Sequence, residues 1–189
     1  MEWLRAISRE DMANLPIRRY EGEVRLVATA EALALEHDAI LRERVLGLDT
    51  ETRPAFRKGE RYAPSLLQLA GDAAAWIFQL QRFDASGFLK SLLEGPIVKA
   101  GVGIGDDLRL LQALFPFEAS AVVEVGTLAR GRGIEQTGLR NLAGIVLGMR
   151  IPKGKRTSNW AAARLTPQQI SYAAMDAWVA RALYLALAR

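Results

Sequence analysis

Patterns typical of strands and of helices alternate along this sequence, and that alternation limits its fold more than any other feature. Short apolar runs bounded by turn residues predict strands over residues 24–27, 44–50, 65–70, 74–80, 97–102 and 121–125. Apolar residues at helical spacing predict helices over residues 30–42, 84–94, 106–115 and about 167–188, with further helix before a basic loop at 150–160. Gly71 and Asp72 between two of the strands indicate a hairpin. A hairpin followed by alternating helices and strands favours a single α/β domain with a mixed sheet and helices packed on it.

The ends of the predicted domain follow from the same periodicity. Residues 1–22 have weak periodicity and predict an irregular lead-in, so we expect the domain to occupy residues 23–189. No apolar run approaches the roughly 18 residues of a membrane-spanning helix. The first residues, MEWLRAISREDM, lack the pattern of a secretion signal. We therefore expect a cytoplasmic protein with no membrane partner.

The residue types present exclude several kinds of chemistry. The 189 residues include no cysteine and one histidine, His37. Disulfides, thiolate zinc sites, cysteine nucleophiles and metal sites with two histidines are therefore excluded. With 25 Lys+Arg against 21 Asp+Glu, the chain is mildly basic, which permits a polyanionic partner without requiring one.

Two acids follow the apolar run of the predicted strand at 44–50. Because side chains alternate along a strand, Asp49 and Glu51 point to one face of the sheet and Thr50 points to the other. Neighbouring carboxylates repel each other unless a cation or a proton lies between them. The spacing alone leaves open whether this is a cation site or a solvated strand end.

Two further acids begin the helix predicted over residues 106–115. Acids are common in a first helical turn because they complement the helix dipole. Leu108, Leu111 and Phe115 define the apolar stripe of this helix, and Asp107 falls beside Leu111 while Asp106 lies well away from the stripe. We therefore expect Asp107 to face an internal site and Asp106 to be a first-turn acid.

The last predicted helix carries a tyrosine and an acid on one face. Tyr172 and Asp176 are four residues apart, and Val179 continues their face inward. A buried carboxylate needs a hydrogen bond, an ion pair or a metal ion, so a pairing with an arginine is the alternative to a metal site. Taken together, carboxylate ligands without cysteine or paired histidines favour Mg²⁺ or Mn²⁺. Two such ions about 3.5–4 Å apart are suited to cleaving a phosphodiester bond.

Three runs in a fixed order resemble a known family. VLGLDTETR, VGIGDDLRLL and SNW…LTPQQISYAAMDA are similar to motifs of the DEDD superfamily of 3′→5′ exonucleases, most closely of the ribonuclease D and Werner-exonuclease branch. The superfamily has either a histidine five positions before its last acid or a tyrosine four positions before it. Here these positions hold Ser171 and Tyr172, as in the tyrosine (DEDDy) branch. The resemblance implies a ribonuclease H-like fold.

The resemblance also implies residue roles. The metal ligands for two divalent ions, Mg²⁺ or Mn²⁺, would be Asp49, Glu51, Asp107 and Asp176, with Asp106 as the alternative to Asp107. Tyr172 would orient the attacking water. The implied reaction is 3′→5′ hydrolysis of RNA or single-stranded DNA from a free 3′ end, which releases nucleoside 5′-monophosphates. A catalytically silent nucleic-acid-binding or scaffolding module on the same fold is the alternative, and the complete set of acids argues against it.

Basic loops next to the first and last motifs predict contacts with the substrate. The candidates for substrate binding are Thr50, Lys155, Ser158 and Trp160, the last by stacking on a base. A solvated loop and a packed tryptophan are the alternatives. The sequence leaves open the oligomeric state and the choice between RNA and DNA, because the phosphodiester bond is common to both.

Overall fold

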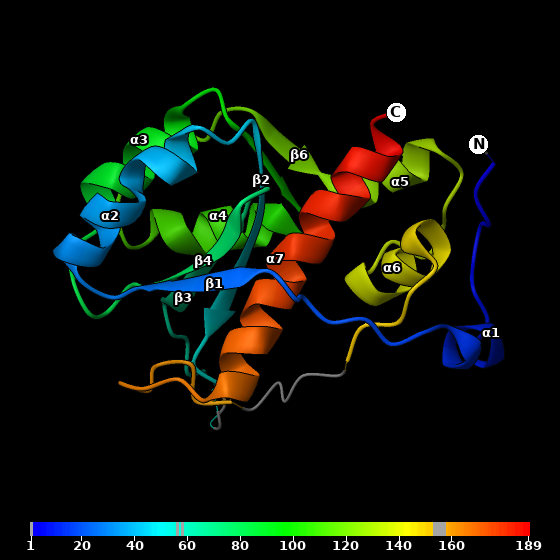
Figure 1. Ribbon diagram of the computed structural model, residues 1–189, viewed down its shortest axis with the longest axis horizontal. Coiled ribbons are helices and arrows are strands. Elements are labelled where there is room, and N and C mark those ends of the chain that lie inside the picture. Colours follow the sequence, from blue (N-terminus) through cyan, green and yellow to red (C-terminus); the bar gives the residue numbers. More distant parts are fainter. Residues whose placement is uncertain (1, 56, 58, 153–157) are drawn as a thin grey trace.

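The computed structural model describes residues 2–55, 57, 59–152 and 158–189, and within them a mixed six-stranded sheet is flanked by helices (Figure 1). The order of strands across the sheet is β1-β4-β3-β2-β5-β6. The elements are α1 (Arg9–Asn14), β1 (Glu23–Val27), α2 (Ala30–Leu41), β2 (Val45–Thr52), β3 (Pro64–Ala70), β4 (Ala74–Gln79), α3 (Ser86–Glu94), β5 (Val98–Gly101), α4 (Ile104–Gln112), β6 (Val122–Glu124), α5 (Val125–Gly131), α6 (Leu139–Leu147) and α7 (Pro167–Leu187). The predicted fold class is confirmed.

The central strand β2 has an antiparallel neighbour, β3, and a parallel neighbour, β5. The hairpin predicted at Gly71 and Asp72 joins β3 to β4, and the Gly71 amide donates a hydrogen bond to the carbonyl oxygen of Ala74 at 2.9 Å. β1 pairs in parallel with β4, and β6 in parallel with β5, at the two edges of the sheet. The mixed sheet therefore places β2 in its interior.

The segment before β1 differs from the irregular structure predicted for it, because residues 9–14 form the helix α1. Ser8 caps this helix: its hydroxyl oxygen accepts a hydrogen bond from the Asp11 amide at 3.0 Å. None of the residues of α1 is buried, so the helix has no apolar stripe that periodicity could detect. Helix α2 is capped in the same way, since the Thr29 hydroxyl accepts a hydrogen bond from the Ala32 amide at 3.2 Å.

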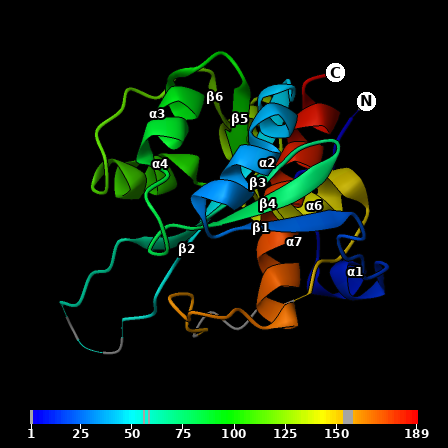
Figure 2. The ribbon, with the colours of Figure 1, turned by 60° about the vertical axis from the view of Figure 1, so that its left-hand side comes forward.

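The two faces of the sheet are covered by different helices (Figures 1 and 2). On one face, α2, α3 and α4 pack large apolar side chains against Leu46 and Leu48 of β2 and against Trp76 of β4. On the other face, α7 crosses the strands through the small residues Ala173 and Ala177. Helices α5 and α6 pack against the outer side of α7.

Gly47 explains how α7 approaches β2 so closely. A Cβ atom at this position would lie 1.8 Å from the carbonyl oxygen of Ala177, which no real contact allows. A glycine is therefore required for the two backbones to meet here. No helix in the described part of the chain combines the length and the apolarity needed to cross a membrane.

Candidate active site

Three carboxylates from two distant segments meet between β2 and α7. Carboxylate oxygens of Asp49, Glu51 and Asp176 lie within 4.8 Å of one another. Asp49 and Glu51 lie on the same face of β2 as Gly47, and this face packs against α7. On α7, Asp176 comes immediately before Ala177, the residue whose backbone lies against Gly47. The close approach of the two backbones at Gly47 thus brings the three acids together.

The fourth predicted acid enters from the other side of β2. Asp107, in the first turn of α4, is half-buried and accepts a hydrogen bond of 2.5 Å from the hydroxyl of Thr50. Asp106 points outward with 78% of its side chain exposed and forms an ion pair with Arg109 at 2.8 Å. The orientations predicted for these two acids are confirmed.

A carboxylate that the sequence analysis missed holds the start of α4. Glu124 accepts hydrogen bonds from the amides of Gly103 at 3.0 Å, Ile104 at 2.9 Å and Gly126 at 3.0 Å. It thereby caps the first turns of both α4 and α5. In the sequence, Glu124 is one acid near the end of the strand predicted over residues 121–125. Nothing in that pattern indicates its contact with Ile104, 20 positions earlier.

Burial and mutual repulsion favour the protonated forms of the clustered acids. Burial, followed by repulsion from Asp176 and Asp107, raises the pKa of Asp49 well above its ordinary value and that of Glu51 to about 8. Burial also raises the pKa of Asp107 and that of Asp176 to about 6. A divalent cation would relieve this repulsion, and an all-oxygen donor set of this kind suits Mg²⁺ or Mn²⁺.

Tyr172 stands next to the cluster, one helical turn before Asp176. Its hydroxyl donates a hydrogen bond to the Asp176 carboxylate. Burial and the nearby negative charges raise the pKa of Tyr172, so the phenol stays neutral and keeps its proton to donate. The aromatic ring packs beside that of Trp160, with ring centroids 5.9 Å apart.

The structure does not support base stacking by Trp160. Its side chain is 2% exposed, so neither face of the indole is open to a base. The ring instead belongs to a small apolar cluster with Leu66, Ile77 and Ala173. Trp160 therefore packs beside Tyr172 at the edge of the pocket that both residues line.

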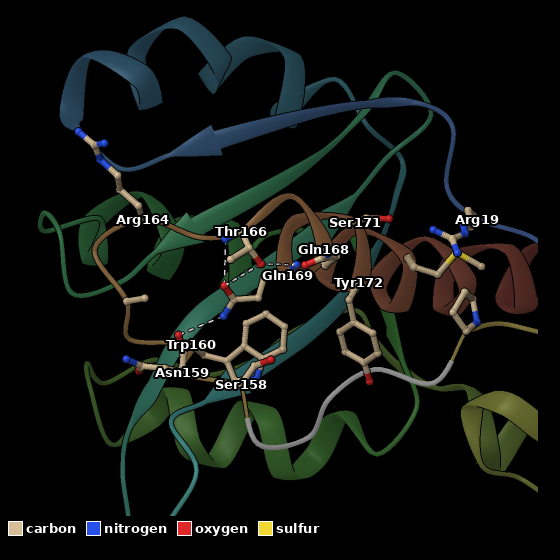
Figure 3. Close-up of a pocket in the computed structure, with 13 residues that line it drawn as sticks. Arg19, Ser158, Asn159, Trp160, Arg164, Thr166, Gln168, Gln169, Ser171 and Tyr172 are labelled. Carbon is tan, nitrogen blue, oxygen red and sulfur yellow. Dashed lines mark hydrogen bonds between the residues drawn. The ribbon is translucent and has the colours of Figure 1, made fainter.

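A pocket of about 660 Å³ opens beside Tyr172 along the start of α7 (Figure 3). Ser158 lines this pocket, and Arg19 and Arg164 contribute positive charge to its wall. Lys155 lies outside the described residues. The hydroxyl of Thr50 contacts Asp107, so it acts within the cluster of acids.

Comparison with known proteins shows the family. A family model described as 3′-5′ exonuclease matches residues 24–189. The chain belongs to the 3′-5′ exonuclease family. This confirms the family predicted from the three motifs.

The relatives include longer proteins. The chain is 31% identical over 205 residues to the exonuclease mut-7 homolog of Homo sapiens, covering 93% of this chain and 23% of that protein. It is 32% identical over 165 residues to ribonuclease D of Gluconacetobacter diazotrophicus, covering 84% of this chain and 41% of that protein. The chain thus spans less than half the length of these relatives.

A solved structure shares the fold. The crystal structure of the Aedes aegypti Nibbler EXO domain superposes with a TM-score of 0.77 at 22% identity, and the match covers 90% of this chain and 89% of that one. The ribonuclease H-like architecture expected from the motifs is thereby confirmed.

Proposed function

We propose that this domain is a metal-dependent 3′→5′ exonuclease that releases nucleoside 5′-monophosphates from the free 3′ end of RNA or single-stranded DNA. The observation that carries the proposal is the group of three carboxylates within 4.8 Å of one another, with a neutral tyrosine hydrogen-bonded to one of them. Membership of the 3′-5′ exonuclease family over residues 24–189 supports it. Residues 23–189 are proposed to form the exonuclease domain, with residues 1–22 as a lead-in.

The positions of the acids suggest how they share two divalent ions. Asp49 would bind both ions, Glu51 and Asp176 would complete one ion site, and Asp107 would hold the other ion from the side of α4. When bound, Mg²⁺ or Mn²⁺ ions supply an activated water and offset the negative charge of the leaving oxygen. In the hydrolysis that these residues would serve, water would add to the phosphorus of the last nucleotide, the bond from that phosphorus to the 3′ oxygen of the preceding nucleotide would break, and the 3′ oxygen would take up a proton.

Tyr172 is proposed to orient the attacking water. Its hydroxyl is a neutral donor adjacent to Asp176, and its ring is held in place by the buried Trp160. The residues proposed to contact the nucleic acid are Ser158 in the pocket, Lys155 in the preceding loop and Thr50 through its backbone. Such contacts to phosphates weaken as salt concentration rises. The cytoplasmic location expected from the sequence stays a prediction.

A degradation assay on end-labelled RNA and single-stranded DNA oligomers tests the proposal, with Mg²⁺, with Mn²⁺ and with EDTA. The wild type should release mononucleotides from the 3′ end in either metal and none in EDTA. Asp49→Asn should lower the rate by roughly 1000-fold or more, because a lost metal ligand removes several kcal/mol of transition-state stabilisation.

Asp106→Asn is the matched control, since this acid belongs to the same helical turn as Asp107 but faces solvent. Its activity should equal that of the wild type. If the wild type degrades neither polymer in either metal, the proposed function is wrong.

A further inference from the structure

A buried glutamine near the acids has no hydrogen-bond partner. Gln68 of β3 is 1% exposed, and both polar atoms of its side chain, Nε2 and Oε1, lack a partner among the described residues. Burying an amide without hydrogen bonds destabilises the folded state. An apolar side chain of similar size would avoid that cost, so the glutamine calls for a functional explanation.

The sheet register places Gln68 directly beside Asp49. The two residues are partners across the antiparallel β2–β3 pair. Cross-strand partners point to the same face, with Cβ atoms about 4.5–5.5 Å apart. Leu66 and Ala70, the residues two positions before and after Gln68, both pack in clusters with alanines of α7. Gln68 therefore lies under α7 on the face that carries the acids.

A second glutamine on this face shows the usual arrangement. Gln79 of β4 is 7% exposed and is the cross-strand partner of Leu66. Its Nε2 donates a hydrogen bond to the carbonyl oxygen of Ala162 at 3.3 Å. The same residue type in a similar environment thus has a partner, whereas Gln68 has none in the part of the chain that the structure describes.

The other acids suggest which partner Gln68 serves. Asp107 accepts a hydrogen bond from the side chain of Thr50, and Asp176 accepts one from that of Tyr172. The backbone of Thr50 opposes the rise in the pKa of Asp49. A carboxylate that binds a metal ion is usually oriented by further hydrogen bonds from neighbouring groups. Gln68, the cross-strand partner of Asp49, has a donor without a partner among the described residues.

We propose that Gln68 is a positioning residue for the metal site: its Nε2 donates a hydrogen bond to the Asp49 carboxylate when divalent ions are bound, and so holds that carboxylate in its binding orientation. The inference rests on the proposed function, because it takes a divalent cation to be the ligand of the acids. The side-chain amide of Gln68 would then find its hydrogen-bond partner only in the metal-bound protein.

Gln68→Met tests this inference, because methionine keeps the length of the side chain and removes both polar atoms. Binding of MnCl₂ to the full chain without nucleic acid is measured by isothermal titration calorimetry. The Kd for Mn²⁺ should rise about 10-fold or more, as is typical when a group that orients a metal ligand is lost. The Tm in EDTA should stay unchanged or rise, because two unpaired buried polar atoms are gone.

Gln79→Met is the matched control. Its Tm in EDTA should fall, because the Ala162 carbonyl loses its donor, while its Kd for Mn²⁺ should equal that of the wild type. An unchanged Kd for Mn²⁺ in Gln68→Met would overturn the inference. That result would leave the proposed nuclease function intact, whereas an inactive wild type would overturn the function without altering the comparison of Mn²⁺ affinities.

Discussion

The two faces of the sheet differ in what their residues contribute. The face under α2, α3 and α4 is closed by a large apolar cluster that includes Leu48 and Trp76. The face under α7 combines small alanines with acids that repel one another. One strand serves both faces by alternation, since Leu46 and Leu48 point to the first and Gly47 and Asp49 to the second. The large apolar cluster and the three clustered acids therefore lie on opposite faces of one sheet, so substitutions can affect stability and chemistry independently.

The largest effect is expected at Gly47, where both backbones meet. In Gly47→Ala the new Cβ would lie 1.8 Å from the Ala177 carbonyl oxygen, so α7 must move away from β2. Displacing Asp176 by about 1 Å should reduce activity about 100-fold. The overpacking should also cost about 1–3 kcal/mol of unfolding free energy. Nuclease rates and urea unfolding measure the two effects, and full activity would show that the close approach is not required.

A substitution on the face under α2, α3 and α4 should change the stability of the protein but not its activity. Leu48 is 1% exposed, so Leu48→Ala should lower the free energy of unfolding by about 2–5 kcal/mol. The value of kcat should equal that of the wild type at a temperature where the variant stays folded, because Leu48 points away from the group formed by Asp49, Glu51 and Asp176. Urea unfolding and steady-state kinetics test this pair of outcomes. A large fall in kcat would mean that the two faces are coupled.

The acids should make the stability of the metal-free protein depend on pH. Burial raises the pKa of Glu51 to about 8 and that of Asp176 to about 6, above their unfolded values. Because the folded state then binds more protons than the unfolded state, stability falls as pH rises from about 4 towards 8. We expect a lower Tm at pH 8 than at pH 5.5 in EDTA, and a smaller decline in Glu51→Gln. Added Mn²⁺ should reduce the decline. Equal declines in the two proteins in EDTA would contradict this explanation.

The smallest effect is expected at Thr50, whose hydroxyl donates a hydrogen bond to Asp107 on the α4 side of β2. Thr50→Val removes the hydrogen bond to Asp107, worth about 1 kcal/mol, so activity should fall about 3- to 10-fold. Thr50→Ser keeps the hydroxyl, so its nuclease rate should equal that of the wild type. If the valine variant matches the wild type, this hydrogen bond does not position Asp107.

Local patterns were sufficient for most of the regular elements after residue 22 and for several orientations in the site. The alternation along β2 predicted which side chains share a face, and the helical spacing of α4 predicted that Asp107 faces inward while Asp106 faces solvent. These predictions depend on periods of two and 3.6 residues, which a single segment contains. The pairing of Tyr172 with Asp176 follows from the same helical spacing.

Other features depended on contacts between distant segments. The burial of Trp160 removed the predicted base stacking, and the role of Glu124 became visible only when β6 was placed beside the start of α4. Gln68 showed no pattern of its own, because its significance comes from its register with Asp49. α1 was missed because it buries no residue and relies on a single cap.

The order of strands and helices after residue 22, the acids available for a metal site and the family of the chain could all be predicted from the sequence, since they depend on local spacing and residue type. Tertiary structure decided which acids meet, how closely α7 approaches β2 and which buried groups lack partners. These depend on the packing of segments that are separate in the sequence, such as β2 and α7, and packing is governed by shape and volume at each contact rather than by any pattern along the chain.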